Sequence, residues 1–272
     1  MNSDEMLNVL LDALKTENKA AANETVPKDT AGKWHLLRAL MNIRPPMPIR
    51  PELLALQDRL LSAQREAKGV TDPQTLPSIH LEFPGTRTPF ADRLALWRGD
   101  ITTLAVDAIV NAANDRLLGC FIPHHRCIDN AIHSAAGIQL RLECNEIVRA
   151  QGHPEPTGRA QITRGYNLPA RYVLHTVGPI ITDGVTEEDQ RLLASCYDAC
   201  MDVAARHEDV KSVAFCCIST GEFRFPRELA AGIALRTVCE WMKRSDGRIE
   251  KVVFDVFSRE DYDLYASLFR AN

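Results

Sequence analysis

The sequence predicts a three-layer α/β domain preceded by a small helical unit, and two observations favour this fold class. After residue 90, short apolar segments alternate with longer amphipathic ones, a pattern typical of three-layer α/β folds. Before residue 90, leucine-rich stripes at helical spacing are separated by prolines. We therefore divide the chain into a helical N-terminal extension over residues 1–90 and an α/β domain over residues 91–272.

Three apolar stripes in the extension predict amphipathic helices, within residues 6–14, 36–41 and 53–61. Proline-containing segments separate and follow them. The stripes and Trp34 are most simply the packing face of the unit, and nothing in it indicates chemistry.

Six short apolar segments of the second domain predict buried strands, at residues 94–97, 108–110, 160–163, 172–177, 212–218 and 251–257. Helices are predicted over residues 129–150, 187–207, 226–244 and 259–270. Ligands of such folds gather beyond the carboxyl ends of the strands. Three loops lie at such ends: residues 98–102, the segment from 111 onward, and residues 219–225.

Composition excludes several classes of function. The 272 residues are 45% hydrophobic and 25% charged, as in globular proteins. A net charge of -4 supplies no basic field for a nucleic-acid backbone, so no nucleic-acid partner is expected. The acidic N-terminus does not resemble a signal peptide, and no apolar run approaches the ~18 residues of a membrane span. We expect a cytoplasmic monomer with reduced cysteines and no membrane partner.

The segment 119–130 gathers two thiols, two imidazoles and a carboxylate. Zinc binds thiolates and neutral imidazoles, and a catalytic zinc site keeps three protein ligands and one open position. Cys120, His125 and Cys127 supply three ligands, with His124 as the alternative imidazole. A lone cysteine is more often packing, but two cysteines with histidines between them favour a metal site. The other cysteines are assigned to packing: Cys144, Cys196, Cys200, Cys216, Cys217 and Cys239.

Polar residues follow two of the predicted strands. Asp100 could accept a hydrogen bond from an amine, or simply form a local turn. Asn111 and Asn114 could bind sugar hydroxyls, and turn formation is again the alternative.

The loop at residues 219–225 runs from a buried strand into a helix. Its backbone N–H groups could cradle a pyrophosphate beside the helix N-terminus, although a plain strand-to-helix turn explains it equally well. Phe223 and Phe225 could stack on a ligand, although aromatic residues at this spacing more often fill a core.

Together these loops resemble the macrodomain family, which binds ADP-ribose. The motifs are Gly-Asp-Ile-Thr at 99–102, Asn-Ala-Ala-Asn at 111–114, Ile-His-Ser-Ala-Ala-Gly at 132–137 and His-Thr-Val-Gly-Pro at 175–179. The resemblance covers roughly residues 94 to 270. It implies an α/β/α macrodomain with a mixed sheet.

The resemblance also implies roles for the loops. Asp100 would hold the adenine amino group, supported by the backbone near Ile101, and Asn114 would face the distal ribose as a catalytic residue. Asn111 belongs to the same ligand-binding set. The phosphate loop would comprise Ser219, Thr220, Gly221, Glu222 and Phe223.

Many hydrolytic macrodomains carry a run of glycines after Asn-Ala-Ala-Asn, where this chain has residues 120–127. That departure resembles the zinc-containing macrodomains known as protein-ADP-ribose hydrolases, in which Cys, His and Cys hold a catalytic zinc. The spacing of that subgroup selects His125. The resemblance implies removal of mono-ADP-ribose from protein side chains, with a carboxylate linkage expected. It also implies a sirtuin-type ADP-ribosyltransferase and a lipoylated carrier protein as partners.

Asp129 matches the catalytic aspartate of hydrolytic macrodomains. From the residues alone it is a general base, an acceptor that orients a metal ligand, or a helix cap. Two other functions stay open for the chain: an ADP-ribose reader that binds without cleaving, and a structural zinc domain that binds an unrelated nucleotide.

Overall fold

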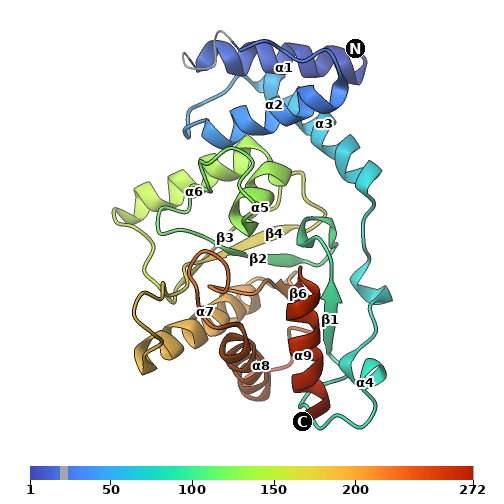
Figure 1. Ribbon diagram of the computed structural model, residues 1–272, viewed down its shortest axis with the longest axis vertical. Helices are drawn as coiled ribbons and strands as arrows, with labels where there is room; N and C mark the ends of the chain where they lie inside the picture. The colour runs from blue at the N-terminus through green and yellow to red at the C-terminus, as the bar shows by residue number, and fades with distance from the viewer. Residues whose placement is uncertain (19–23, 272) are drawn as a thin grey trace.

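A six-stranded mixed sheet organises the α/β domain of the computed structural model, which describes residues 1–18 and 24–271 (Figure 1). The strands are β1 (Leu94–Arg98), β2 (Ala108–Ala112), β3 (Ala160–Arg164), β4 (Tyr172–Thr176), β5 (Ser212–Phe215) and β6 (Lys251–Val256). Their order across the sheet is β1-β6-β5-β2-β4-β3. All neighbours are parallel except β3, which is antiparallel to β4. The predicted fold class and mixed sheet are confirmed.

Helices cover both faces of this sheet. Helices α5 (Ile128–Ala136) and α6 (Ile138–Gln151) pack on one face. The other face carries α7 (Glu187–Ala205), α8 (Arg227–Arg244) and α9 (Arg259–Ala271), as Figure 1 shows. Alternating Val, Ile, Leu and Phe side chains of the central strands fill the two cores between the layers, because strands buried on both faces read as apolar runs.

The N-terminal extension forms three helices, α1 (Ser3–Glu17), α2 (Thr30–Ile43) and α3 (Pro51–Lys68), with a short α4 (Ile79–Glu82) before β1. The predicted stripes become the shared core of α1–α3, which Ile138 at the start of α6 joins. Figure 1 shows α2 and α3 lying beside α5 and α6, at one end of the molecule. The boundary at residues 90 and 91 stays a prediction.

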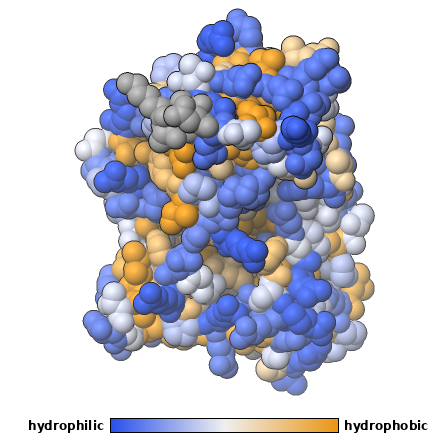
Figure 2. Space-filling view, turned by 45° about the horizontal axis from the view of Figure 1, so that its top comes forward, coloured by the Kyte–Doolittle hydropathy of each residue, from blue (hydrophilic) through white to orange (hydrophobic). Residues whose placement is uncertain are grey.

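Among the described residues, no helix combines the length and apolar character required to cross a membrane. The face shown in Figure 2 is mostly hydrophilic, with hydrophobic residues in small separate groups. Exposed apolar side chains include Phe121 and Ile122. Both belong to residues 119–130, called here the cysteine- and histidine-rich segment.

Two predicted elements are corrected by the structure. The single helix expected over residues 129–150 is two helices, because Gly137 adopts φ 100° and ends α5. A side chain at this glycine would also meet Gln57, since an added Cβ would lie 2.6 Å from Nε2. The strand expected over residues 212–218 ends at Phe215, and the chain then turns through Ser219 with φ 65°.

Replacing Gly137 tests the origin of the break between α5 and α6. Gly137→Ala should lower the free energy of unfolding by about 1–3 kcal/mol, because alanine resists positive φ and Gln57 is held by its own hydrogen bonds. The matched control is Gly232→Ala in α8, where an added Cβ meets nothing and alanine favours the helix. Denaturant titration checks both, and equal effects would contradict this account.

Candidate active site

The parallel strands bring the predicted site loops to one edge of the sheet. Asp100 follows β1, Asn111 and Asn114 end or follow β2, and the loop at residues 219–225 follows β5. Because β1, β2 and β5 run in the same direction, their carboxyl ends share that edge. The topology therefore brings the three predicted loops to one edge of the sheet, and their role in binding stays a prediction.

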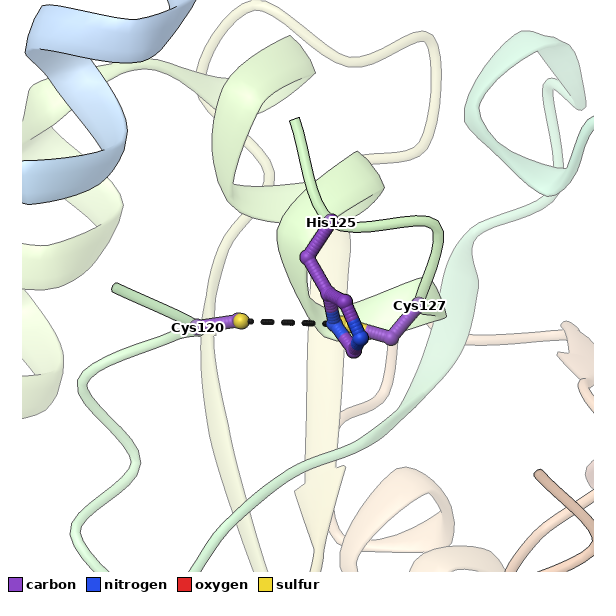
Figure 3. A group of neighbouring side chains, drawn as sticks. All are labelled: Cys120, His125 and Cys127. Carbon is purple, nitrogen blue, oxygen red and sulfur yellow. Dashed lines mark hydrogen bonds between the residues drawn. The ribbon is translucent and has the colours of Figure 1, made fainter. Parts of the chain in front are cut away.

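Cys120, His125 and Cys127 converge between β2 and α5. One donor atom from each lies within 4.8 Å of the others, and all three side chains are partly exposed. Figure 3 shows the Cys120 side chain pointing toward the His125 imidazole, with Sγ 3.5 Å from Nδ1. Helix α5 begins directly after Cys127, so the helix start positions the third ligand.

Of the two neighbouring histidines, His125 is the one that reaches the thiols. Its Nδ1 faces Cys120, while its Nε2 lies 3.4 Å from Oε1 of Glu222 in the loop after β5. His124 instead stacks its ring on His35 of α2, at a centroid separation of 3.5 Å. The backbone reversal at His124, with φ 57°, sends the two rings in different directions.

The donor set has the chemistry of a zinc site. Burial, the largest cause, together with the neighbouring Cys120 and Asp129 charges raises the pKa of the Cys127 thiol to about 12, against the lowering effect of the Asn130 backbone hydrogen bond. A second negative charge beside Cys120 is therefore disfavoured without a cation, and a divalent ion bound between the sulfurs would offset it. Two thiolates and one imidazole are borderline-soft ligands that suit zinc.

Asp129 lies one residue into α5 and two residues after Cys127 of the candidate metal-binding set. Its Oδ1 accepts from Asn111 Nδ2 at 2.8 Å and its Oδ2 from Asn114 Nδ2 at 3.2 Å. Burial raises the pKa of this carboxyl to about 6 against those two hydrogen bonds. The helix-cap alternative for Asp129 is wrong, because the cap is Cys127, whose Sγ accepts from Asn130 N at 3.4 Å.

A second cluster of His133, Cys144 and His175 lies buried beneath Asp129. Asn111 Nδ2 can only donate, so Nδ1 of His175 at 3.2 Å must accept. The proton of His175 then sits on Nε2, where it donates to Thr163 Oγ1 at 2.9 Å. With both ring nitrogens engaged, His175 has no lone pair for a metal, and the cluster is part of the core.

The remaining predicted ligand-binding residues line the same edge. Asp100 Oδ1 accepts from the backbone and hydroxyl of Thr102, and Oδ2 lies 3.7 Å from Lys68 Nζ at the end of α3. Ile101, in the short 3-10 helix Ile101–Thr103, is buried. The Asp100 carboxylate is partly exposed, so it can still accept a hydrogen bond from a ligand amine.

The loop after β5 has the features of a cradle. Ser219 has a positive φ, and its buried Oγ has no hydrogen-bond partner among the residues that the structure describes. Gly178 faces it so closely that an added Cβ would lie 1.9 Å from that oxygen. Phe223 is partly exposed, whereas Phe225 is 1% exposed and packs in the core, so stacking on a ligand is excluded for Phe225. Thr220 and Gly221 follow Ser219 in this turn and precede Phe223.

Sequence reasoning misses the residues of α2 and α6 that contact the cysteine- and histidine-rich segment. Asn42 and His35 of α2 touch His124, and buried Arg141 of α6 donates to Leu118 O at 2.6 Å. Their sequence surroundings read as helix packing. The one available signal was a polar residue on an apolar helical stripe, and that signal is weak.

The fold is an α/β domain in which the predicted ligand-binding loops meet at the strand ends. The Macro domain family profile matches residues 110–234. A protein-ADP-ribose hydrolase of Treponema medium is 47% identical over 259 residues, covering 95% of this chain and 96% of that protein. One from Staphylococcus aureus strain MSSA476 is 48% identical over 245 residues, covering 90% and 87%.

Solved structures of macrodomains align with the fold of this chain. The Trypanosoma brucei macrodomain in complex with ADP-ribose aligns with a TM-score of 0.64 at 30% identity, covering 85% of this chain and 94% of that one. The Oceanobacillus iheyensis macrodomain with ADP aligns with a TM-score of 0.58 at 37% identity, covering 64% and 88%. The chain belongs to the macrodomain family.

The buried His175 predicts a pH dependence of stability. Burial lowers the pKa of His175 from the usual 6.5 to about 3. The contribution of the neutral imidazole to the free energy of unfolding is therefore complete above pH 6.5 and is lost as the pH falls toward 3. Relative to His175→Gln, the wild type should lose about 1.4 kcal/mol of unfolding free energy per pH unit in that window. Denaturant titrations of chelator-treated protein measure the two slopes, and parallel slopes would contradict the assignment.

Proposed function

We propose that this protein is a zinc-dependent hydrolase that removes mono-ADP-ribose from modified protein side chains, with a carboxylate linkage as the substrate class. The observation that carries the proposal is the juxtaposition of a partly exposed Cys120/His125/Cys127 set with the buried Asp129 carboxylate. A structural zinc site would be closed by four protein ligands. Among the described residues, the group that includes Cys120 holds three.

The chemistry required is cleavage at the anomeric carbon of the distal ribose. Positive charge develops on the sugar and negative charge on the departing carboxylate oxygen. A zinc ion held by Cys120, His125 and Cys127 would polarise a ribose or substrate oxygen, or lower the pKa of a bound water to about 7. Two thiolates offset the formal charge of that ion, so positioning of the ribose matters as much as water activation.

Asp129 is placed to handle a proton or to orient the ribose. Asn111 and Asn114 donate to its two oxygens and hold the carboxylate in one orientation. We assign Asn114 to the distal ribose and Asp129 to a hydroxyl or water beside it, as acceptor of the proton.

Binding energy would come from the remote parts of the substrate. Asp100 would accept from the adenine amino group beside Ile101, and the backbone at Ser219, Thr220, Gly221, Glu222 and Phe223 would hold the pyrophosphate. The unpartnered Ser219 Oγ supports a polar ligand at this loop.

The names of relatives support the reaction. The Treponema medium and Staphylococcus aureus relatives are protein-ADP-ribose hydrolases, and they align over nearly their whole lengths. A Fusarium relative, 43% identical over 88% of this chain and 41% of its own, is a probable bifunctional ADP-ribose hydrolase/ADP-ribosyltransferase. Its name supports a functional link to a transferase. A sirtuin-type transferase and a lipoylated carrier protein remain our proposed partners.

Metal analysis tests the ligand assignment. The purified protein should contain about one zinc per chain, and Cys120→Ala or Cys127→Ala should lose it. Cys239→Ala is the matched control, because this thiol lies on α8 and bonds to Pro89 O, away from the set. Full zinc retention in both ligand variants would remove the assignment.

Turnover separates a hydrolase from a reader. On a carboxylate-linked mono-ADP-ribosylated protein, the wild type should release free ADP-ribose and a chelator should stop the release. Cys120→Ala should lower kcat by about 100-fold or more, with the Kd for ADP-ribose within about threefold, because adenine and pyrophosphate bind elsewhere. Asn114→Ala should show a milder loss of the same kind. If the protein binds ADP-ribose tightly but shows no metal-dependent release from any linkage, the hydrolase proposal fails and the protein is an ADP-ribose reader.

A further inference from the structure

Helix α2 of the N-terminal extension reaches the cysteine- and histidine-rich segment through one buried amide. Asn42, in the last turn of α2, is 1% exposed. Its Oδ1 accepts from the backbone N–H of His124 at 3.1 Å, and its Nδ2 donates to Ser134 Oγ of α5 at 2.9 Å. A single side chain therefore ties α2 to the segment and to the helix that follows it.

The bond to Asn42 supports an uncommon backbone conformation. His124 has φ 57°, a left-handed conformation that non-glycine residues adopt only with support from their surroundings. The His35 ring covers the His124 ring at 3.5 Å and an angle of 15°. His124 directly precedes His125, so its backbone conformation sets the direction in which the His125 imidazole leaves the chain.

A second contact from α2 reaches Asn130, the residue whose backbone N–H bonds to the Cys127 sulfur. Arg38 donates from Nη2 to Asn130 Oδ1 at 2.8 Å, which fixes the orientation of that fully buried amide. Asn130 Nδ2 then donates to Ile122 O at 3.0 Å, and Asn130 N donates to Cys127 Sγ at 3.4 Å. Arg38 thus supports the segment on both sides of His125.

Arg141 of α6 bonds both to the end of α2 and to the chain just before Cys120. Its Nη1 donates to the carbonyls of Met41 and Asn42 at 3.0 and 2.9 Å, while its Nε holds Leu118 O just before Cys120. Its guanidinium also lies over the Phe121 ring at 4.3 Å. The carboxyl end of α2 and the start of the segment are therefore anchored to one buried cation.

We propose that α2 is a positioning element for the Cys120/His125/Cys127 metal site, and that Asn42 is its principal positioning residue. The inference rests on the metal site of the proposed function. Partners behind metal ligands fix ligand geometry, and their loss typically weakens metal binding by about 10- to 100-fold. The N-terminal extension therefore acts on the site as well as packing beside it.

Cobalt substitution tests the role of Asn42. Co²⁺ bound by two thiolates and an imidazole reports ligand geometry through its visible absorption bands. Asn42→Ala should shift those bands and weaken Co²⁺ and Zn²⁺ binding by about tenfold or more, with ADP-ribose affinity unchanged within about twofold. Asn42→Asp keeps the acceptor for His124 N–H and should restore the bands and the metal affinity. His35→Ala, at an exposed residue that does not endanger folding, should weaken binding in the same direction.

One control variant separates positioning from general destabilisation. Lys33→Met breaks the ion pair with Asp4 inside the extension, away from the segment. This variant should bind metal as the wild type does. A Lys33→Met effect equal to that of Asn42→Ala, or wild-type bands in both Asn42→Ala and His35→Ala, would overturn the inference while the metal site stands. A wild type that binds neither metal would overturn the proposed function, and this inference with it.

Discussion

The Asp129 carboxylate is buried, and its two oxygens accept from Asn111 and Asn114. A buried carboxylate without such donors would be strongly destabilising, so these hydrogen bonds constrain everything near them. Asn111 belongs to β2 and Asp129 to α5, and the bond between them therefore joins the sheet to the helix that begins at Cys127. The same amide reaches His175 of β4, which extends the network to the next strand.

The position of the Cys120/His125/Cys127 set follows from this network. With α5 held against β2, the segment from residue 115 to residue 127 must return to a helix start whose place is already determined. Its own composition cannot make it rigid, because Phe121, Ile122 and Pro123 are exposed. Rigidity comes from outside, through Asn130, Arg141 and the residues of α2. Buried polar side chains that satisfy backbone groups specify one conformation, because a hydrogen bond has a direction. An apolar contact has none and would leave the conformation less defined.

Much of the fold and part of the site could be predicted from sequence, for local reasons. Period-two and helical apolar patterns are properties of neighbouring residues, so the strands and the helices α7, α8 and α9 were found within a few residues of their ends. The merged helix over residues 129–150 was wrong because only a contact with Gln57, 80 residues earlier, shows that Gly137 sits against another helix. The helix-cap alternative for Asp129 failed because a cysteine, which is not a favoured cap, occupies that place.

By itself, the sequence determined the residue types and their order: two cysteines and a histidine at short spacing, amides at the end of a strand, and a small-residue turn before a helix. These depend only on covalent neighbours and on the periods of helix and strand. Tertiary structure alone decided that Asn111 and Asn114 hold Asp129 and that α2 supports the segment, and it brings His125, the imidazole that the family spacing selects, to the thiols. The physical reason is that each is a contact between distant parts of the chain, such as Asn42 with His124, and burial together with hydrogen-bond satisfaction selects it only once the layers are packed.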